Sequence, residues 1–462
     1  MTAALEALYR ALVEAVGLDR VLTDPGDCFV YGYDNSRKHS LPEAVVFPVT
    51  ENEVQAIVRA CRHHNTPLVA RGRGTGTAGA AVPLKGGVVA SLERMRRIIE
   101  VDADNRLMRV EPGVTNQEAQ RAAAARGFFW PPDPTSAAYC SVGGNIAVNA
   151  AGPRAVKYGT VRENVLGLRA VTGAGDLIRT GVDTTKGAVG YDLTRLLIGS
   201  EGTLAIITQA TLKLTPLGAA RRTLRVVYED MHSAAHGVSR IMAQPVTPYV
   251  LEFLDGGAIR MVPEFQKTLP ARSGALLLIE VDGPEAAMDE ALAAVSAAAR
   301  GRGLLDITIA NSVEEAQALW AVRKALSPAL RTLAPNKLNE DVVVPVSRIP
   351  ELIAGLDDLS LRFGIPIVNF GHAGNGNIHV NLLYDSQNAE QERQARPALS
   401  EVFDLVLRLG GTLSGEHGVG MEKRDYVARA IDAPTLALMR AIKAQFDPDA
   451  ILNPGKLFPV AE

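Results

Sequence analysis

Hydrophobic and polar positions near the start of the chain follow a strand, helix, strand pattern. Residues Glu51–His64 have helical periodicity, and Thr50 with Glu53 three residues later predicts a capping box at the start of this helix. Short apolar runs bounded by polar or glycine-rich segments predict buried strands on either side. These strands are Ala44–Phe47, Pro67–Ala70 and Val88–Leu92. The sequence therefore predicts a small βαβ unit.

The pattern changes twice further along the chain. Residues 98–216 read mostly as short strands with glycine turns, interrupted by one helix, which indicates an α+β subdomain; the elements are Leu107–Val110, Asn116–Arg126, Leu166–Thr172 and Leu204–Leu214. From about residue 219, strands alternate with alanine-rich helices, which predicts a second domain; the elements are Leu224–Val227, Ala275–Val281, Pro284–Arg300 and Val313–Leu326. A final helix is expected at Ala433–Gln445. Within Met1–Gly17, a leucine-rich stripe predicts a docking helix.

Composition narrows the class of protein. The chain has 462 residues, 47% of them hydrophobic and 21% charged, which favours two or three globular domains. A formal net charge of -3 gives no general electrostatic reason to bind nucleic acid or a membrane surface. Three widely spaced cysteines without a C-x-x-C pair favour a reducing, cytoplasmic location. The longest apolar runs are too short for a membrane span, so integral membrane contact is not expected.

A glycine-rich loop follows the second predicted strand. Gly74–Gly79 matches G-x-G-x-x-G, but the continuation through Pro83 to Gly87 cannot hold the helix that a Rossmann site needs at its third glycine. What remains is a loop that presents backbone amides to an anion, such as a dinucleotide pyrophosphate. The alternative is a mobile surface loop.

Two histidines lie in a predicted hairpin. In the segment 368–381, apolar strands flank a Gly-Asn-Gly turn, so His372 and His379 are expected on facing strands where both imidazoles can converge on one cation. Glu416, followed by His417 between glycines, offers a further ligand. The alternative for each histidine is a hydrogen-bonded loop residue.

An arginine interrupts the apolar stripe of a predicted helix. Ser312 and Glu315 form a second capping-box pattern, and the helix is expected to run from Val313 to about Ser327 and to stop at Pro328. Arg323 lies within the stripe, where an unpaired guanidinium is costly, so it needs a buried anion. The anion is either a substrate carboxylate or a protein acid such as Asp341.

Several longer motifs carry a resemblance to a known family. They are Pro131–Thr135, Cys140–Arg154, Lys157–Gly159, Gly190–Leu193 and Gly199–Leu204. Together with the glycine loop they resemble the FAD-binding domain of the vanillyl-alcohol oxidase superfamily, with D-lactate, glycolate and D-2-hydroxyglutarate dehydrogenases as the nearest likeness. The likeness covers roughly residues 40–216 and 310–458.

The resemblance implies an α+β fold. It consists of a two-subdomain FAD-binding domain of the vanillyl-alcohol oxidase (PCMH) type, an α+β substrate-binding cap and a C-terminal closing segment. The expected divisions are an N-terminal helical segment at 1–41, the FAD-binding domain at 42–218, the cap at 219–413 and the C-terminal segment at 414–462. The active site is expected between the FAD-binding domain and the cap.

The resemblance also implies which residues bind FAD. The loop has Arg73 and Thr75 but lacks the histidine to which relatives attach FAD covalently, so FAD is expected to be noncovalent. The residues expected at the cofactor are Arg71, Gly72, Arg73, Gly74, Thr75, Gly76, Thr77, Pro132, Asp133, Thr135, Ser136, Gly143, Gly144, Asn145, Asn149, Gly202, Ile206 and Asn453.

A divalent metal completes the expected site. The resemblance assigns it to His372, His379 and Glu416, with zinc the first choice and manganese or iron the alternatives. Asn375 stands where relatives commonly carry Asp. His417 is expected to be the catalytic base, with a fourth metal ligand or a structural residue as the alternative.

The substrate is expected to be held by its acid group. The resemblance implies that Arg323 binds the substrate carboxylate, and Lys337 and Lys423 are further candidates for the same pocket.

The expected reaction is oxidation of a small D-2-hydroxy acid to the 2-oxo acid, with hydride transfer to flavin N5. Electrons would then pass to a cytochrome, a quinone or an electron-transfer flavoprotein, and this partner could place the protein at the periphery of a membrane. A homodimer is the assembly considered. The alternatives are ether-bond formation without net redox, as in alkyldihydroxyacetonephosphate synthase, and a non-catalytic FAD- and metal-binding role.

Overall fold

The structure is a computed structural model that describes residues 3–218, 220–261 and 267–459. The chain forms two compact units. The first comprises Met1–Gly152, Gly159–Leu217 and Glu416–Glu462, and the second comprises Pro153–Tyr158 and Gly218–Gly415. Residue 219, where the cap was predicted to begin, and residues 1–2 of the predicted docking helix lie outside the described residues.

The first unit contains a four-stranded sheet near its N-terminus. Its order is β1 (Val21–Leu22), β2 (Ala44–Val46), β4 (Val88–Ser91) and β3 (Leu68–Arg71), with β4 parallel to both β2 and β3. Helices α1 (Ala3–Val16) and α3 (Glu51–His63) contribute apolar side chains to its core. The predicted βαβ unit, the docking helix and the Thr50–Glu53 capping box are confirmed. The short helix α2 (Pro25–Phe29) follows β1.

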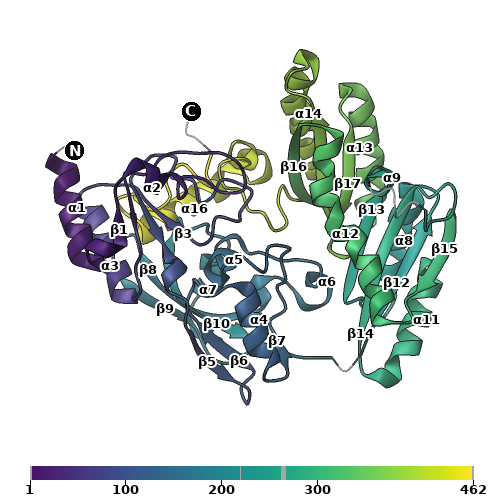
Figure 1. The fold of residues 1–462 in the computed structure, drawn as a ribbon, viewed down its shortest axis with the longest axis horizontal. Coiled ribbons are helices and arrows are strands. Elements are labelled where there is room, and N and C mark those ends of the chain that lie inside the picture. The colour runs from purple at the N-terminus through teal and green to yellow at the C-terminus, as the bar shows by residue number, and fades with distance from the viewer. Residues whose placement is uncertain (1–2, 219, 262–266, 460–462) are drawn as a thin grey trace. The chain divides into compact units, whose positions relative to one another are not determined.

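A five-stranded antiparallel sheet forms the other part of the first unit. Its order is β5 (Ile98–Asp102), β6 (Leu107–Val110), β10 (Ala205–Lys213), β8 (Val165–Thr172) and β9 (Leu177–Gly181). Residues from α4 (Asn116–Ala124), α5 (Val142–Val148), α7 (Leu193–Leu197) and α16 (Ala433–Phe446) pack against its core. Trp130 is fully buried there and donates from Nε1 to Asn164 O at 2.9 Å. A two-stranded ribbon joins β7 (Phe128–Phe129) to β11 (Thr215–Pro216). Figure 1 shows these strands and helices of the first unit.

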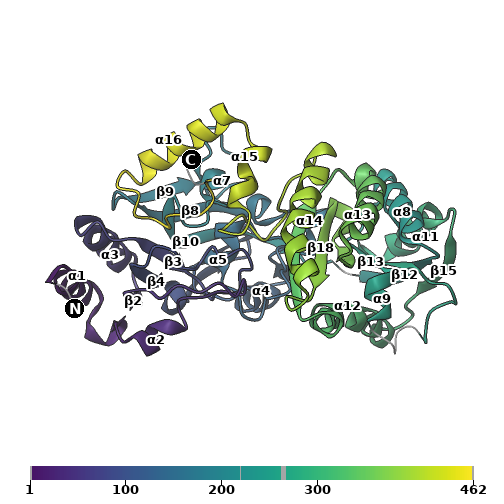
Figure 2. The same cartoon turned by 90° about the horizontal axis from the view of Figure 1, so that it is seen from above.

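The second unit is built on one seven-stranded antiparallel sheet. Its order is β15 (Leu304–Ile309), β12 (Ala220–Tyr228), β14 (Ala275–Gly283), β13 (Val250–Asp255), β17 (Ile367–Gly371), β18 (Asn377–Tyr384) and β16 (Asn336–Val343). One face of this sheet is covered by α8 (Met231–Ala243), α11 (Met288–Ala299), α13 (Ile349–Phe363) and α14 (Ala389–Arg408) (Figure 2). Helices α9 (Gly256–Arg260) and α12 (Val313–Leu333) cover the other face. Because both faces are covered, the central strands are apolar at consecutive positions.

Helix α12 differs from the prediction at both ends. It continues through Pro328 to Leu333, so the predicted stop is wrong. The continuation buries Leu330 beside Leu326 in the core, and burial of such a side chain is worth about 1.5–3 kcal/mol, which offsets the roughly 3 kcal/mol cost of an interior proline. At its start, Ser312 accepts from Glu315 N, but Glu315 accepts from Asn311 N, one residue before the expected capping-box partner.

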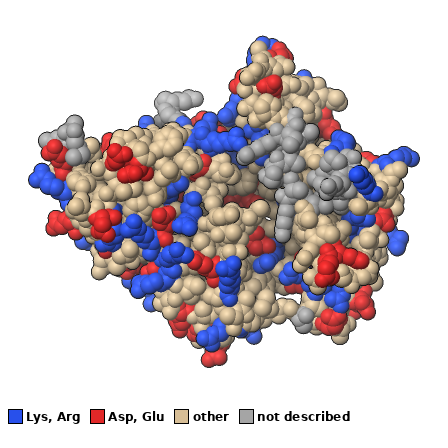
Figure 3. Space-filling model, in the orientation of Figure 1, with Lys and Arg blue, Asp and Glu red and all other residues tan. Residues whose placement is uncertain are grey.

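The distribution of charged side chains does not change the prediction from composition, which gave no general electrostatic reason to bind nucleic acid or a membrane surface. Lys and Arg are interspersed with Asp and Glu over the face seen in Figure 3. Among the residues that the structure describes, none of the helices combines the length and the apolar character that crossing a bilayer requires.

Candidate functional site

The glycine loop lies in the first unit and has no helix between Gly72 and Gly87, which confirms that it is not a Rossmann turn. Gly74 and Gly79 have φ of 65° and 74°, so both need glycine. A Cβ on Gly72 would collide with Ser141 Oγ and lie 3.6 Å from Gly144 Cα. The loop therefore runs directly against the start of α5.

Both arginines of the loop are engaged with protein groups. Arg71 is buried and donates from Nη1 to Tyr33 O at 2.6 Å, and Arg73 Nη1 lies 3.6 Å from Glu93 Oε2. These contacts fix the loop against neighbouring segments. The groups of the loop best suited to a pyrophosphate are consequently its backbone amides.

The start of α5 contains a buried amide that lacks a partner. Ser141 caps this helix by accepting from Gly144 N at 3.2 Å. Asn145 is 4% exposed, and within the described ranges its Nδ2 makes no hydrogen bond. A buried donor without a protein acceptor is costly, so Asn145 Nδ2 is suited to donate to a bound group. Nearby, Asn116 Nδ2 donates to Pro132 O at 3.0 Å and holds the segment that contains Asp133, Thr135 and Ser136.

The remaining predicted cofactor residues have mainly structural contacts. Asn149 Oδ1 accepts from Arg162 N at 3.0 Å, and Gly202, with φ of 69°, belongs to the turn before β10. The Ile206 side chain packs in the hydrophobic core, so only its backbone could meet a cofactor. Asn453 Nδ2 donates to Ala80 O at 2.9 Å and to Glu201 O at 2.7 Å. Asn453 therefore joins the end of the glycine loop to this turn.

These features fit FAD. The glycine loop, the start of α5 and the turn at Gly199–Gly202 lie together, since Glu201 N donates to Ala147 O at 2.8 Å and Asn453 bridges the turn to the loop. Together they present backbone amides and the unused Asn145 donor, which suits a ligand that carries a pyrophosphate and ring carbonyls.

The three predicted metal ligands lie together. Strands β17 and β18 form the predicted hairpin, with Phe370 opposite His379. His372 follows β17, and its ring centroid is 5.2 Å from that of His379. One ligand atom from each of His372, His379 and Glu416 lies within 4.8 Å of the others. Two imidazoles and one carboxylate suit zinc, manganese or iron(II), so the donor set fits a divalent metal.

Asp341 fixes the peptide that delivers Glu416. Gly415 is the last residue of the second unit, and its N–H donates to Asp341 Oδ2 at 2.8 Å. Ser414 Oγ donates to Asp341 Oδ1 at 3.1 Å. A Cβ at Gly415 would lie 2.7 Å from Asn377 Nδ2, so this close approach requires glycine. Asp341 therefore anchors the segment that leads into Glu416, and the acid that pairs with Arg323 is a different one.

Glu252 is the acid that pairs with Arg323, and the sequence analysis did not identify it. Its Oε2 accepts from Arg323 Nε at 2.5 Å, and its Oε1 is hydrogen-bonded to His372 Nδ1. Burial alone would raise the pKa of Glu252, but the His372 and Arg323 charges outweigh it and hold this pKa well below its usual range. The sequence did contain a signal for this residue, because Glu252 is an acid within the otherwise apolar run 250–254.

The other predicted site residues are less closely defined. His417 is half-buried and follows Glu416, and Asn375 is exposed at the hairpin turn. Lys337 lies on β16 opposite Leu383, in the second unit. Lys423 is 2% exposed in the first unit; burial raises the pKa of Glu201, and the Lys423 charge opposes this rise without cancelling it. Their roles at the substrate stay predictions.

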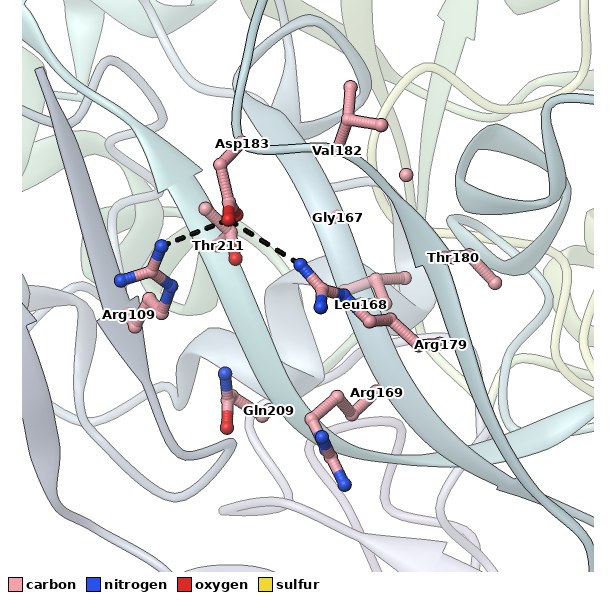
Figure 4. Close-up of a pocket in the computed structure, with 11 residues that line it drawn as sticks. Arg109, Gly167, Leu168, Arg169, Arg179, Thr180, Val182, Asp183, Gln209 and Thr211 are labelled. Carbon is pink, nitrogen blue, oxygen red and sulfur yellow. Dashed lines mark hydrogen bonds and ion pairs between the residues drawn. The ribbon is translucent and has the colours of Figure 1, made fainter. Parts of the chain in front are cut away.

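A separate depression of about 230 Å³ lies on the outer face of the five-stranded sheet (Figure 4). Arg109 and Arg179 both pair with Asp183 there, and Arg169 pairs with Glu51. These arginines are neutralised by the protein's own acids. None of the predicted cofactor or metal residues lines this depression, so it is not the candidate site.

Comparison with known proteins defines the class of this one as an FAD-dependent oxidoreductase. Residues 42–181 match the FAD binding domain family, and residues 217–457 match the C-terminal domain of FAD linked oxidases. The chain belongs to this family of FAD-linked oxidases, within the group that resembles the D-2-hydroxy acid dehydrogenases.

Three relatives illustrate the similarity. The chain is 39% identical to the glycolate oxidase subunit GlcD of Bacillus subtilis, over 93% of this chain and 92% of that protein. It is 33% identical to a D-lactate dehydrogenase of Anaerostipes hadrus over 90% and 89% of the two chains. It is 34% identical to a D-2-hydroxyglutarate dehydrogenase of Stutzerimonas stutzeri over 98% and 99%.

Solved structures confirm the predicted fold class. The structure of p-cresol methylhydroxylase with substrate bound matches with a TM-score of 0.82 at 19% identity, covering 99% of this chain and 98% of that one. An alkyldihydroxyacetonephosphate synthase matches with a TM-score of 0.74 at 20% identity, covering 97% and 85%. These likenesses show the vanillyl-alcohol oxidase type of fold.

Proposed function

We propose that this protein oxidises a small D-2-hydroxy acid to the corresponding 2-oxo acid, with noncovalent FAD and a divalent metal. The observation that carries the proposal is the cluster of His372, His379 and Glu416, with Arg323 tied to His372 through Glu252. A metal and a guanidinium placed so closely suit a substrate with a hydroxyl beside a carboxylate. The names of the three relatives support the same substrate class.

The proposed roles of the residues follow from their chemistry. Arg323 binds the substrate carboxylate, for which its planar group offers N–H donors beyond the one given to Glu252. His372, His379 and Glu416 hold the metal, which when bound polarises the C2 hydroxyl. His417 accepts the hydroxyl proton, and Lys337 and Lys423 contribute positive charge to carboxylate binding.

The bound FAD supplies the acceptor for the hydride that leaves C2. Loss of that hydride and of the hydroxyl proton converts the 2-hydroxy acid into the 2-oxo acid, so two electrons and two protons leave the substrate. The Arg71–Thr77 loop, the Pro132–Ser136 segment, the start of α5 and Asn453 are proposed to hold FAD. We further propose zinc as the metal, a cytochrome, quinone or electron-transfer flavoprotein as the final acceptor, and a cytoplasmic homodimer as the assembly.

A synthase-like reaction without net redox is the alternative. It has the support of a shared fold at 20% identity, whereas the relatives named for oxidation are 33–39% identical. Under anaerobic conditions, a dehydrogenase bleaches the flavin absorbance durably when its substrate is added. A synthase-like enzyme would leave no durable bleaching with any hydroxy acid.

The test is flavin reduction across a panel of D- and L-lactate, glycolate and D- and L-2-hydroxyglutarate, before and after chelator treatment. We expect one D-2-hydroxy acid or glycolate to bleach the flavin, and we expect chelation to slow this step and zinc or manganese to restore it. Absence of bleaching with the whole panel would overturn the substrate class. Bleaching that is unaffected by removal of all bound metal would overturn the metal's role.

A further inference from the structure

Glu252 is a fully buried acid that is hydrogen-bonded to one of the proposed metal ligands. It lies in the middle of β13, between Leu251 and Phe253, and its side chain is 0% exposed. A carboxylate in such surroundings is costly unless each oxygen is bound to a donor. Its position in a central strand of the seven-stranded sheet therefore has to be supported by specific partners.

The two oxygens of Glu252 serve different partners. Oε1 is bonded to His372 Nδ1, and Oε2 accepts from Arg323 Nε at 2.5 Å. A carboxylate accepts hydrogen bonds and cannot donate them when ionised, so this contact requires the proton of His372 on Nδ1. In this tautomer Nε2 carries the lone pair with which an imidazole can bind a metal ion.

The backbone around Glu252 fixes these distances. Strands β13 and β17 pair through Phe253 with Gly371 and Leu254 with Phe370, one and two residues before His372. The neighbouring Asp255 accepts from Asn369 N at 2.5 Å and strengthens the same pairing. On the other side, the Arg323 guanidinium lies 4.9 Å from the Phe370 ring centroid. The strand pairing therefore holds Glu252 beside His372, and the same strand β17 carries the aromatic ring next to Arg323.

We propose that Glu252 is a positioning residue that sets, with one carboxylate, both the metal-binding orientation of His372 and the orientation of Arg323 toward the substrate carboxylate. This inference rests on the proposed function. Its consequence is that metal binding and carboxylate recognition depend on the same side chain. A change at Glu252 weakens both, because its two oxygens are bonded to His372 and Arg323.

Replacement of Glu252 by glutamine tests whether the carboxylate itself is needed or only a side chain of the same size. Glutamine has the same shape, but it offers one acceptor oxygen and one donor group. Glu252→Gln can keep the bond to His372 or the bond to Arg323, and its amide then faces the N–H of the other partner. Glu252→Asp keeps the charge but is one methylene shorter, so it cannot reach both partners.

The neighbouring strand offers a matched control. Glu280 on β14 is 5% exposed and accepts from Trp320 Nε1 at 2.6 Å and from Thr223 Oγ1 at 3.0 Å. Trp320 lies one helical turn before Arg323 on α12. Glu280→Gln is thus the same substitution in the same sheet, against the same helix, and it retains the oxygen that accepts both bonds.

The experiment measures zinc affinity, which does not depend on turnover. The FAD-loaded full chain is depleted of metal with a chelator, and Zn²⁺ and Mn²⁺ are titrated by calorimetry into wild type, Glu252→Gln, Glu252→Asp and Glu280→Gln. Thermal melting verifies that each variant is folded. Loss of an outer partner of a metal-binding histidine typically costs about 10- to 100-fold in affinity, so we expect this loss in both Glu252 variants. We expect less than about threefold in Glu280→Gln, whose change is remote from the ligands.

A kinetic readout accompanies the titration. For the substrate found in the panel, KM should rise in Glu252→Gln at saturating zinc, because Arg323 is released from its fixed position. Equal zinc affinity in wild type and both Glu252 variants would overturn the inference and leave the proposed reaction intact. A wild type that binds neither Zn²⁺ nor Mn²⁺ would overturn the proposed metal and the inference together. If Glu252→Gln does not fold, Glu252→Asp decides by the same criterion.

Discussion

Glu201 accepts the backbone N–H of Val419 at 2.6 Å, although the two residues are 218 positions apart in the sequence. The second oxygen of the same carboxylate accepts from Gly420 N at 2.7 Å. A Cβ at Gly418 would lie 2.7 Å from Glu201 Oε1, so the chain wraps closely around this acid. Within the first unit, Glu201 thereby fixes the segment that directly follows Glu416 and His417.

Removal of this carboxylate should destabilise the protein. Glu201→Ala leaves two amides without their acceptor, at about 1–3 kcal/mol each, so we expect a loss of about 2–6 kcal/mol in the free energy of unfolding. Urea denaturation followed by tryptophan fluorescence and flavin release measures it. Glu285→Ala, which removes an exposed ion pair with Arg222, should change stability by less than about 0.5 kcal/mol. A Glu201→Ala protein as stable as this control would contradict the anchoring role.

The unused donor of Asn145 gives a test of the FAD site. Asn145→Asp replaces this buried donor by an acceptor, and we expect FAD affinity to fall about tenfold or more, since a hydrogen bond contributes about 0.5–1.5 kcal/mol and a buried charge adds to the loss. Titration of the FAD-free protein with FAD, followed by quenching of flavin fluorescence, measures the dissociation constant. The control is Asn164→Asp. In the wild type, Asn164 Nδ2 already has a protein acceptor, because it donates to Thr160 O at 2.7 Å. If both variants bind FAD equally, Asn145 has no contact with the cofactor.

The metal ligands should act as a set. Wild-type protein, dialysed against zinc and then against metal-free buffer, should retain about one ion per chain, as a site with two imidazoles and one carboxylate does. We expect His379→Ala and Glu416→Ala to retain almost none, as measured by inductively coupled plasma mass spectrometry. His232→Ala, at an exposed contact 3.3 Å from Asp357, should retain the ion. Full occupancy in either ligand variant would exclude that residue from the site.

Lys456 predicts a pH dependence of stability. Burial lowers its pKa from 10.5 to about 8, which the nearby Asp34 and Glu201 charges only partly oppose. Between pH 8 and 10.5 the unfolded chain then holds a proton that the folded chain has released. The unfolding free energy therefore rises with pH across this window, by up to about 3 kcal/mol for a shift of this size.

The pH effect can be isolated with Lys456→Met, which removes the titrating group. Denaturant titrations at pH 7.5, 9 and 10 should show wild type gaining stability relative to Lys456→Met. A difference between the two proteins that is constant over this range would show that the Lys456 pKa is ordinary in the folded state.

Local sequence patterns predicted much of the site. The Gly-Asn-Gly turn between two apolar strands was sufficient to place His372 and His379 in one hairpin, because strand pairing at a tight turn leaves little freedom. The proline after the glycine loop likewise excluded a Rossmann helix. Each of these features depends on neighbours within about a dozen residues.

These local patterns could not identify contact partners that lie far apart in the sequence. Arg323 needed a buried anion, but Glu252 lies 71 residues away, and only the pairing of β13 with β17 brings it beside His372. Asp341 was an equally reasonable acid in the sequence, and it proved to hold Gly415. The course of α12 beyond Pro328 was also set by tertiary packing of Leu330, which no local signal reports.

The chain passes between the two units at residues 152–153, 158–159, 217–218 and 415–416. Residues 153–158 interrupt the sequence of the first unit but belong to the second. Tyr158 in this segment donates to Asp282 Oδ2 at 2.7 Å, also in the second unit. The last segment returns to the first unit, where Leu452 bridges Leu68 on β3. Neither unit is contiguous in sequence, so division of the chain after residue 217 would leave each half without one segment of its own unit. Residues 416–462 of the first unit are synthesised only after the whole of the second unit, so the first unit cannot be completed before the second has been synthesised.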